Sequence, residues 1–367
     1  MAEYGFAIVG CGMIADFHAA AIEELENGRL VVAASRSEEN ARRVAEAHHC
    51  DWTTNYEDVY ARDDVDIVNV CTPSGAHAEI AVDAAAAGKH VVVEKPLEVT
   101  LERCDRIIEA IDANRVTLAV IFPSRWSEVI GRVKSAVEAG RFGRLTLGDA
   151  HIKWWRTQEY YDSGGWRGTR QLDGGGALMN QGIHTVDVLQ WLMGPVRRIE
   201  AFTGTLAHQR IEVEDVAVAA LEFQSGALGV IEGTTAAFPG LSRWIGVHGD
   251  KGSAIIQDSS LVRWDFAESR AEDDEVAQHY APTYQAASVI WMPGGFSVRE
   301  RKGSGAGAAD PRAISHAGHR RQLADLLAAL DEGRPPLVDG REGRKAVEII
   351  LAIYQSAQTG AAVTLPL

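Results

Sequence analysis

The stretch AIVGCGMIADFHAAAI, residues 7–22, decides how the first part of this chain folds. Its apolar start is typical of a buried strand, and a glycine pair and a helical pattern follow directly. In the pattern G-x-G-x-x-A, Gly10 permits a tight turn and Gly12 lets backbone N–H groups approach a pyrophosphate, while the small Ala15 lets helix and strand pack closely. This strand–turn–helix context predicts dinucleotide binding. The predicted contacts in this loop are Gly10, Gly12, Met13 and Ile14.

More strand–helix units follow this turn. Short apolar runs fall at Phe6–Val9, Leu30–Ala34, Ile67–Val70, His90–Val93 and Thr117–Ile121. Amphipathic, Ala-rich segments such as AHAEIAVDAAAAGK lie between them. Apolar strands that alternate with helices predict a doubly wound parallel sheet covered on both faces, and such sheets bind ligands beyond the carboxyl ends of their strands. We therefore predict an α/β protein with a Rossmann domain over residues 1–122.

The pattern changes after Pro123. Alternating strand-like runs follow, separated by Gly or polar turns, and they predict a mostly antiparallel open sheet. Helices are predicted near Ser127–Ala139, Ile183–Leu192, His316–Leu330 and Glu342–Ala357. Together these elements predict a second α/β domain over residues 123–367. Residues 268–312 begin with an acidic run and continue as a loose Gly-rich stretch, which we interpret as a surface loop.

Composition excludes several classes of protein. The 367 residues suffice for two domains, and 46 % hydrophobic and 24 % charged residues are ordinary values for a soluble protein. A net charge of −15 argues against a nucleic-acid partner. Four scattered cysteines without a CxxC pair fit a reducing cytoplasm, without disulfides or structural zinc. No signal peptide and no apolar stretch of about 20 residues is visible, so we expect a cytoplasmic protein that does not enter a membrane.

The end of the second strand indicates which dinucleotide binds. An acid at this position would bind the ribose 2′-OH of NAD, but residues 34–37 read ASRS. A serine hydroxyl at Ser35 and a guanidinium at Arg36 suit a 2′-phosphate, so the sequence favours NADP(H) over NAD(H). The alternative is that Arg36 is an exposed residue at the start of a helix.

Two further segments follow strand ends on the same side of the predicted sheet. In VCTPSGAH, residues 70–77, Thr72 and Pro73 are predicted to pass under the cofactor. His77 is a further predicted cofactor contact, and we interpret it as a helix-start residue with a structural hydrogen bond rather than a catalytic residue. In VVVEKP, residues 91–96, a buried strand ends in an acid, a base and a proline, which by itself is typical of a solvated strand end.

With GCGMIA, CTPSGAH and VVVEKP in this order, the chain resembles the Gfo/Idh/MocA family of sugar and cyclitol oxidoreductases. The resemblance extends to DGGGALMNQGIHTVDVLQWL, residues 173–192, and to the closing SAQTGAAVTLPL, so it covers essentially the whole chain. It implies an active site between the two domains, no metal, and subunits that pair into dimers or tetramers through the exposed face of the second sheet. It also implies hydride transfer between a nicotinamide and a ring carbon of a sugar, glycoside, nucleotide-sugar or cyclitol.

The resemblance also assigns roles to single residues. Lys95 would hydrogen-bond the hydroxyl being oxidised, with Glu94 near the cofactor. His184 is the candidate general base, because imidazole titrates close to neutral pH. Asn180 is the third predicted catalytic residue. It stands where many family members carry Asp, so it would position substrate hydroxyls, and proton handling would depend more on Lys95 and His184. Asp187 could orient the imidazole, or it could be a structural acid.

The segment WWRTQEYYDSGGWRGTR, residues 154–170, is rich in aromatic and basic residues. Aromatic faces pack on the C–H faces of sugar rings, and Arg binds hydroxyls or phosphate. In the family the WR pair before the glycine cluster lies near the cleft, which favours Trp166 and Arg167 over Tyr160. The family also places Arg125 and Trp166 at the cofactor. The predicted substrate contacts are Lys95, Tyr160, Trp166, Arg167, Asn180 and His184.

Two other functions share these motifs. One is a glycosidase that oxidises its substrate transiently and keeps NAD tightly bound. The other is a cofactor-sensing regulator without catalysis, which the presence of both Lys95 and His184 makes the less favoured hypothesis.

Overall fold

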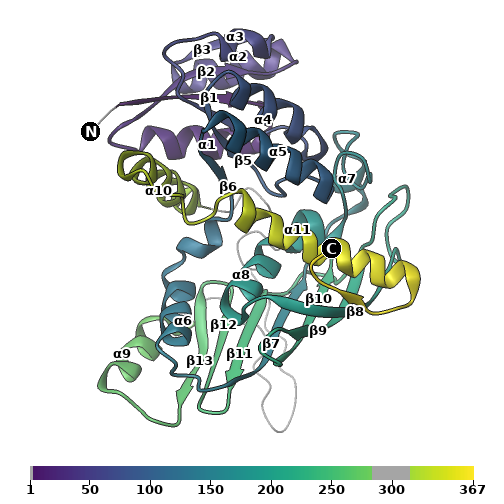
Figure 1. Cartoon of the computed structure of the whole chain (residues 1–367). Helices are drawn as coiled ribbons and strands as arrows, with labels where there is room; N and C mark the ends of the chain where they lie inside the picture. Colours follow the sequence, from purple (N-terminus) through teal and green to yellow (C-terminus); the bar gives the residue numbers. More distant parts are fainter. Residues whose placement is uncertain (1–2, 283–314) are drawn as a thin grey trace. The chain divides into compact units, whose positions relative to one another are not determined.

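The computed structural model describes residues 3–282 and 315–367, and the chain divides into two compact units (Figure 1). The first unit consists of Met1–Trp126, Ser163–Asp187 and Ser315–Leu351. The second unit consists of Ser127–Asp162, Val188–Ile314 and Ala352–Leu367. The glycine-rich segment before residue 187 therefore folds with the dinucleotide motif, although the two are far apart in sequence.

The first unit is built on a six-stranded sheet with the order β3-β2-β1-β4-β5-β6. Its strands are β1 (Tyr4–Val9), β2 (Gly28–Ala34), β3 (Asp51–Thr53), β4 (Ile67–Val70), β5 (His90–Val93) and β6 (Leu118–Val120). All neighbouring strands are parallel, which confirms the predicted doubly wound sheet. The short edge strand β3 has no apolar run in its sequence, and our strand prediction missed it.

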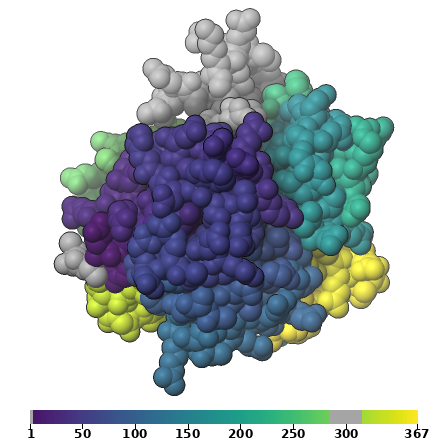
Figure 2. All heavy atoms as spheres, turned by 90° about the horizontal axis from the view of Figure 1, so that it is seen from above, coloured from purple at the N-terminus to yellow at the C-terminus, as the bar shows by residue number. Residues whose placement is uncertain are grey.

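Helices cover the sheet of the first unit. They are α1 (Met13–Glu23), α2 (Glu38–His48), α3 (Tyr56–Tyr60), α4 (His77–Ala86), α5 (Leu101–Asn114) and α10 (Ala317–Glu332), with short turns η1 (Ser74–Ala76), η2 (Pro123–Trp126) and η3 (Ala177–Gly182). The central strands are buried on both faces, so their side chains are apolar throughout. Leu323 and Leu326 of α10 join the same core as Phe6 and Ile8, and Figure 1 shows α10 beside α1. In Figure 2 the N-terminal part of this unit, in purple and blue, covers one continuous area of the face that is shown.

The second unit contains an eight-stranded sheet with the order β13-β12-β11-β7-β10-β9-β8-β14. Its strands are β7 (Leu145–Lys153), β8 (Val196–Gly204), β9 (Val216–Phe223), β10 (Leu228–Thr234), β11 (Trp244–Gly249), β12 (Gly252–Gln257), β13 (Ser260–Phe266) and β14 (Val363–Thr364). Only β10 and β7 pair in parallel, so the predicted mostly antiparallel sheet is confirmed. Burial alternates along β9 and β10, which is the reason for the alternating sequence pattern.

The remaining helices are α6 (Glu128–Glu138), α7 (Gln158–Asp162), α8 (Ile183–Met193), α9 (Ala271–His279) and α11 (Gly340–Thr359). Helices α8 and α11 each have residues in both units. In the parts of the chain that the structure describes, no helix has both the length and the apolar character needed to cross a bilayer.

The interpretation of residues 268–312 as a loop is wrong for α9. Acidic residues fill its first turn, where the helix dipole favours negative charge. Asp273 accepts hydrogen bonds from the backbone N–H of Arg270 and from the indole of Trp264, and it pairs with Arg141. The acidic run that looked like a solvated loop is thus a helix start. Residues 283–314 lie outside the described part of the chain.

Candidate active site

The glycine turn between β1 and α1 has the shape that a dinucleotide requires. Gly10 has φ +103°, and a Cβ there would lie 2.6 Å from the carbonyl carbon of Cys71, so only glycine fits. A Cβ added to Gly12 would meet no atom within 4 Å, and this open space lies at the N-terminus of α1. The Thr72 hydroxyl beside this turn is buried and has no hydrogen-bond partner among the described residues. These residues fit a bound pyrophosphate at the helix N-terminus.

The end of β2 contains no acid but has arginines close by. The Ser35 hydroxyl accepts a hydrogen bond from the N–H of Ser37, and the Ser37 hydroxyl in turn caps α2. Arg36 is exposed at this strand end. Arg43, on α2, donates to the carbonyl of Cys11 in the glycine turn at 3.3 Å. The sequence analysis missed Arg43, because in sequence it is one of several charges on an amphipathic helix.

His77 connects the segment that follows β4 with the segment that follows β5, and these two strands are neighbours in the sheet. Its Nδ1 lies 2.9 Å from the carbonyl of Pro96, and its Nε2 lies 3.0 Å from the carbonyl of Thr72. The structural hydrogen bond expected for His77 is therefore present. Pro73 directly follows Thr72 in sequence. The cofactor contacts of Thr72, Pro73 and His77 stay predictions.

Lys95 and Asn180 meet within the first unit, although 85 positions separate them. Lys95 is the second residue after β5, and its ammonium donates to the main-chain carbonyl of Asn180 at 2.9 Å. Asn180 belongs to η3, a π-helical turn, and its side-chain amide donates to Asp173 at 2.5 Å and accepts from Gln181 at 2.8 Å. The parallel sheet thus brings the EKP lysine to the glycine-rich segment.

His184 lies at the start of α8, immediately after the turn that contains Asn180. It is half-buried, and its ring packs edge-on against Phe122 with the centroids 5.7 Å apart. Lys95 is bound to Asn180, four residues before His184, and all three residues belong to the first unit. Their joint role in proton transfer stays a prediction.

Arg125 and Asp187 form a buried ion pair in the same unit. The guanidinium donates to both oxygens of Asp187, at 2.6 and 2.9 Å, and to Glu342 at 3.0 Å. The Arg125 side chain is 1 % exposed and that of Asp187 is fully buried. Of the two roles considered for Asp187, the structural one is therefore the one these contacts support. A cofactor contact of Arg125 stays a prediction.

Glu94 points into the interior of the first unit. One of its oxygens lies 2.9 Å from Nε2 of His18 and 3.5 Å from Nε2 of His319, and the other accepts the backbone N–H of Lys95. Burial opposes ionisation, but the hydrogen bonds from the two histidines outweigh it and hold the pKa of Glu94 well below its usual range. Asn69 contacts the remaining ring nitrogen of His18 at 2.8 Å.

The spacing of Glu94, His18 and His319 would also suit a metal ion, since their ligand atoms lie within 4.8 Å of one another. The contact between His18 and Glu94, at 2.9 Å, also has the geometry of a hydrogen bond between an imidazole and a carboxylate. Sequence analysis did not find this group, because its members come from three distant segments.

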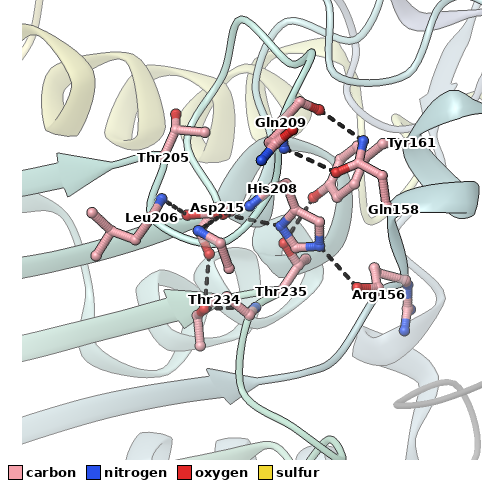
Figure 3. A network of polar contacts seen from close by, with 12 residues as sticks. Arg156, Gln158, Tyr161, Thr205, Leu206, His208, Gln209, Asp215, Thr234 and Thr235 are labelled. Atoms are coloured by element: carbon pink, nitrogen blue, oxygen red, sulfur yellow. Dashed lines mark hydrogen bonds and ion pairs between the residues drawn. The ribbon is translucent and has the colours of Figure 1, made fainter.

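The predicted substrate contacts of the aromatic segment fall in both units. Arg167 stacks on Trp166 at 4.9 Å and donates to the carbonyl and hydroxyl of Ser163, all in the first unit. Tyr160 lies in the second unit, where its ring packs on Tyr161. Tyr161 is buried in a polar network, with its hydroxyl 2.7 Å from that of Thr235 (Figure 3).

Comparisons with known proteins agree with this architecture. Residues 4–122 match the model of the oxidoreductase family with an NAD-binding Rossmann fold. Residues 130–255 match the model of the GFO/IDH/MocA C-terminal domain. The chain is 30 % identical over 270 residues to myo-inositol 2-dehydrogenase of Thermotoga maritima, covering 70 % of this chain and 77 % of that protein. It is 27 % identical to inositol 2-dehydrogenase of Rhizobium meliloti, covering 71 % of this chain and 78 % of that protein.

A solved structure agrees over the full length. The WlbA dehydrogenase of Bordetella pertussis, in complex with NADH and UDP-GlcNAcA, is 33 % identical with a TM-score of 0.86. The alignment covers 100 % of this chain and 99 % of that one. Together with the glycine turn and the lysine at the end of β5, these matches identify the chain as an oxidoreductase of the Gfo/Idh/MocA family.

Proposed function

We propose that this protein is an NADP(H)-dependent dehydrogenase that oxidises a ring hydroxyl of a sugar-like substrate. The observation that carries the proposal is the contact of the Lys95 ammonium with Asn180. It holds a positive charge at the carboxyl end of a central parallel strand, where ligands of such sheets bind.

The glycine turn, Thr72 and Arg36 would hold the cofactor, whose nicotinamide supplies the hydride acceptor when it is bound. Lys95 would donate a hydrogen bond to the substrate oxygen and stabilise the negative charge that develops on it. His184 would accept the proton of the hydroxyl, because a neutral imidazole is available near neutral pH. The buried Arg125–Asp187 pair would anchor α8 three residues after His184.

The substrate class follows from the relatives and from local chemistry. The relatives named above are inositol dehydrogenases and a WlbA dehydrogenase bound to a nucleotide-sugar. A nucleotide-sugar is the substrate we favour, since WlbA matches this chain over its full length and Arg167 and Arg170 can bind a pyrophosphate.

The experiment is an absorbance screen at about 340 nm, with NAD and NADP each paired with monosaccharides, inositols, glycosides and UDP-sugars. The proposal expects a rise in absorbance with at least one ring-hydroxyl substrate. Cleavage of a glycoside without net reduction of free cofactor would instead support the glycosidase hypothesis. Cofactor binding without turnover of any substrate would support a regulator.

NADP(H) is favoured because no acid stands at the end of β2, where Ser35 and the exposed Arg36 are found. We expect Arg36→Asp to lower kcat/KM for NADP by at least about 10-fold and to raise it for NAD, because a carboxylate repels the 2′-phosphate and binds the 2′-OH. The measurement is the ratio of kcat/KM for the two cofactors. Arg42→Asp, on the neighbouring helix α2, where Arg42 pairs with Glu38 and stacks on Trp52, is the matched control. An unchanged ratio in Arg36→Asp would contradict the NADP proposal.

The protein is also proposed to form homo-oligomers through the exposed face of the eight-stranded sheet. That face presents Leu147, Phe202, Val218, Leu228 and Trp244, and Phe202 is 78 % exposed. Exposed apolar side chains on several neighbouring strands are typical of an interface. We expect Phe202→Asp to produce smaller particles in light scattering, whereas Leu206→Asp, equally exposed but outside the strands, should not. A monomeric native protein would refute this part of the proposal.

A further inference from the structure

Asp173 is a buried acid that has no direct role in the reaction proposed above. Its side chain is only 1 % exposed. One oxygen accepts the backbone N–H of Gly168 at 2.8 Å, and the other accepts the side-chain amide of Asn180 at 2.5 Å. The Asn180 amide oxygen accepts from Gln181, so the orientation of this amide is fixed: its NH₂ must face the carboxylate.

These contacts control the position of Asn180, whose main-chain carbonyl binds Lys95. The N–H of Asn180 donates to Gly176 at 3.2 Å within the π-helical turn η3. Its side chain is bound to Asp173, and its carbonyl receives the Lys95 ammonium. Asp173 therefore anchors the turn on which Lys95 depends.

The negative charge of Asp173 is unfavourable for the stability of the fold, because the carboxylate is buried. Burial raises its pKa to about 6, even though Gly168, Asn180 and the charges of Lys95 and Arg167 lower it. Asp215 shows the opposite case among buried aspartates. Burial also opposes its ionisation, but the backbone N–H groups of Leu206, Ala207 and His208 and the ring of His208 outweigh it and lower its pKa (Figure 3). Asp173 is thus a charge held at a cost to the fold, which is typical of functional sites.

We propose that Asp173 is a positioning residue that holds the Lys95 ammonium in place through Asn180 and supplies the negative charge that faces it. This inference rests on the proposed function, because it assigns Asp173 to the same reaction. The charged groups that face Asp173 are Lys95, from the end of β5, and Arg167, from the segment before the glycine cluster.

The kinetic test is Asp173→Asn. We expect kcat to fall by about 100-fold at neutral to alkaline pH, because the ammonium is displaced from its reactive position, while the Kd for NADP is unchanged. The ratio of native to variant kcat should shrink below about pH 6, where native Asp173 is protonated and resembles Asn. The effect of His184 protonation on kcat cancels in this ratio, because both proteins contain His184. A ratio that stays constant with pH would overturn the proposal.

The stability test uses the coupling between the protonation of Asp173 and the free energy of unfolding. The pKa of Asp173 is higher in the folded protein than in the unfolded chain, so its contribution to stability is lost as pH rises from about 4 to above about 6. The difference in melting temperature, Asp173→Asn minus native, should therefore become more positive as the pH rises from about 5 to about 8. Asp273→Asn is the matched control, since Asp273 is buried and ionised in both states over that range, and its partners Arg141, Trp264 and the N–H of Arg270 do not titrate there. Its relative melting temperature should stay constant.

A third measurement needs no substrate and separates this inference from the proposed function. The lysines are ¹³C-methylated reductively, and Lys95 is assigned by the signal missing in Lys95→Ala. In an NMR titration the pKa of Lys95 should be lower in Asp173→Asn than in the native protein, since a facing negative charge is lost. If no substrate is turned over but this pKa falls, the proposed function fails and the positioning contact stands. An unchanged pKa of Lys95 would refute the contact itself.

Discussion

Lys95→Ala should lower kcat by about 100- to 1,000-fold while the affinity for NADP stays within about twofold of the native value. The ammonium is the group that would stabilise charge on the substrate oxygen, and it donates a hydrogen bond to the carbonyl of Asn180. The glycine turn, which would bind the pyrophosphate, does not depend on this side chain. Steady-state kinetics and calorimetric titration with NADP measure the two effects separately.

Lys134→Ala is the matched control for this prediction. Lys134 also donates from its ammonium to a main-chain carbonyl, that of Trp191, at 2.9 Å, but it lies on α6 in the second unit. We expect its kcat to be unchanged. If Lys95→Ala retained native turnover, the assignment of proton handling to this residue would be wrong.

Arg125→Met should be the most destabilising of the substitutions considered, with a loss of about 3–5 kcal/mol in the free energy of unfolding. It leaves the carboxylate of Asp187, which is fully buried, without its cation. Glu342 is less affected, because it is partly exposed and also pairs with Lys345. Urea unfolding of the native and variant proteins gives the difference.

The double variant Arg125→Met with Asp187→Leu tests the cause of that loss. Removing both charges leaves no unpaired carboxylate at Asp187, so we expect most of the lost stability to return. The same double variant also shows whether Arg125 contacts the cofactor. If it is stable but has lost affinity for NADP, Arg125 binds cofactor directly, whereas native affinity assigns it a structural role.

The sequence predicted the parallel sheet and the glycine turn of the first unit well, because the signals of both are local. Buried parallel strands are continuous apolar runs, and the glycine turn requires its residues in a fixed order. Strand β3 was missed because only three residues at the sheet edge carry it. Helix α9 was mistaken for a loop because of its acidic first turn. Arg141 and the helix dipole stabilise this turn, and the amino-acid composition of the segment reveals neither interaction.

The candidate site was only partly predictable from sequence. The motifs named Lys95, Asn180 and His184, but which atoms of Asn180 bind Lys95 depends on a π-helical turn that has no sequence signature. Asp173 was missed because an Asp before a glycine cluster is an ordinary turn residue. Glu94 was expected near the cofactor, and the histidines that direct it into the interior come from α1 and α10, far away in sequence.

The most direct test of the central claim is the fate of a deuterium placed on the reacting ring carbon of a substrate found in the absorbance screen. The account predicts that the label appears at C4 of the nicotinamide in released NADPH, with absorbance at about 340 nm rising in step and more slowly than with the unlabelled substrate. It also predicts that Lys95→Ala transfers the same label, only more slowly. Substrate consumed with its label retained, and no reduced cofactor released, would contradict net hydride transfer as the function of this protein.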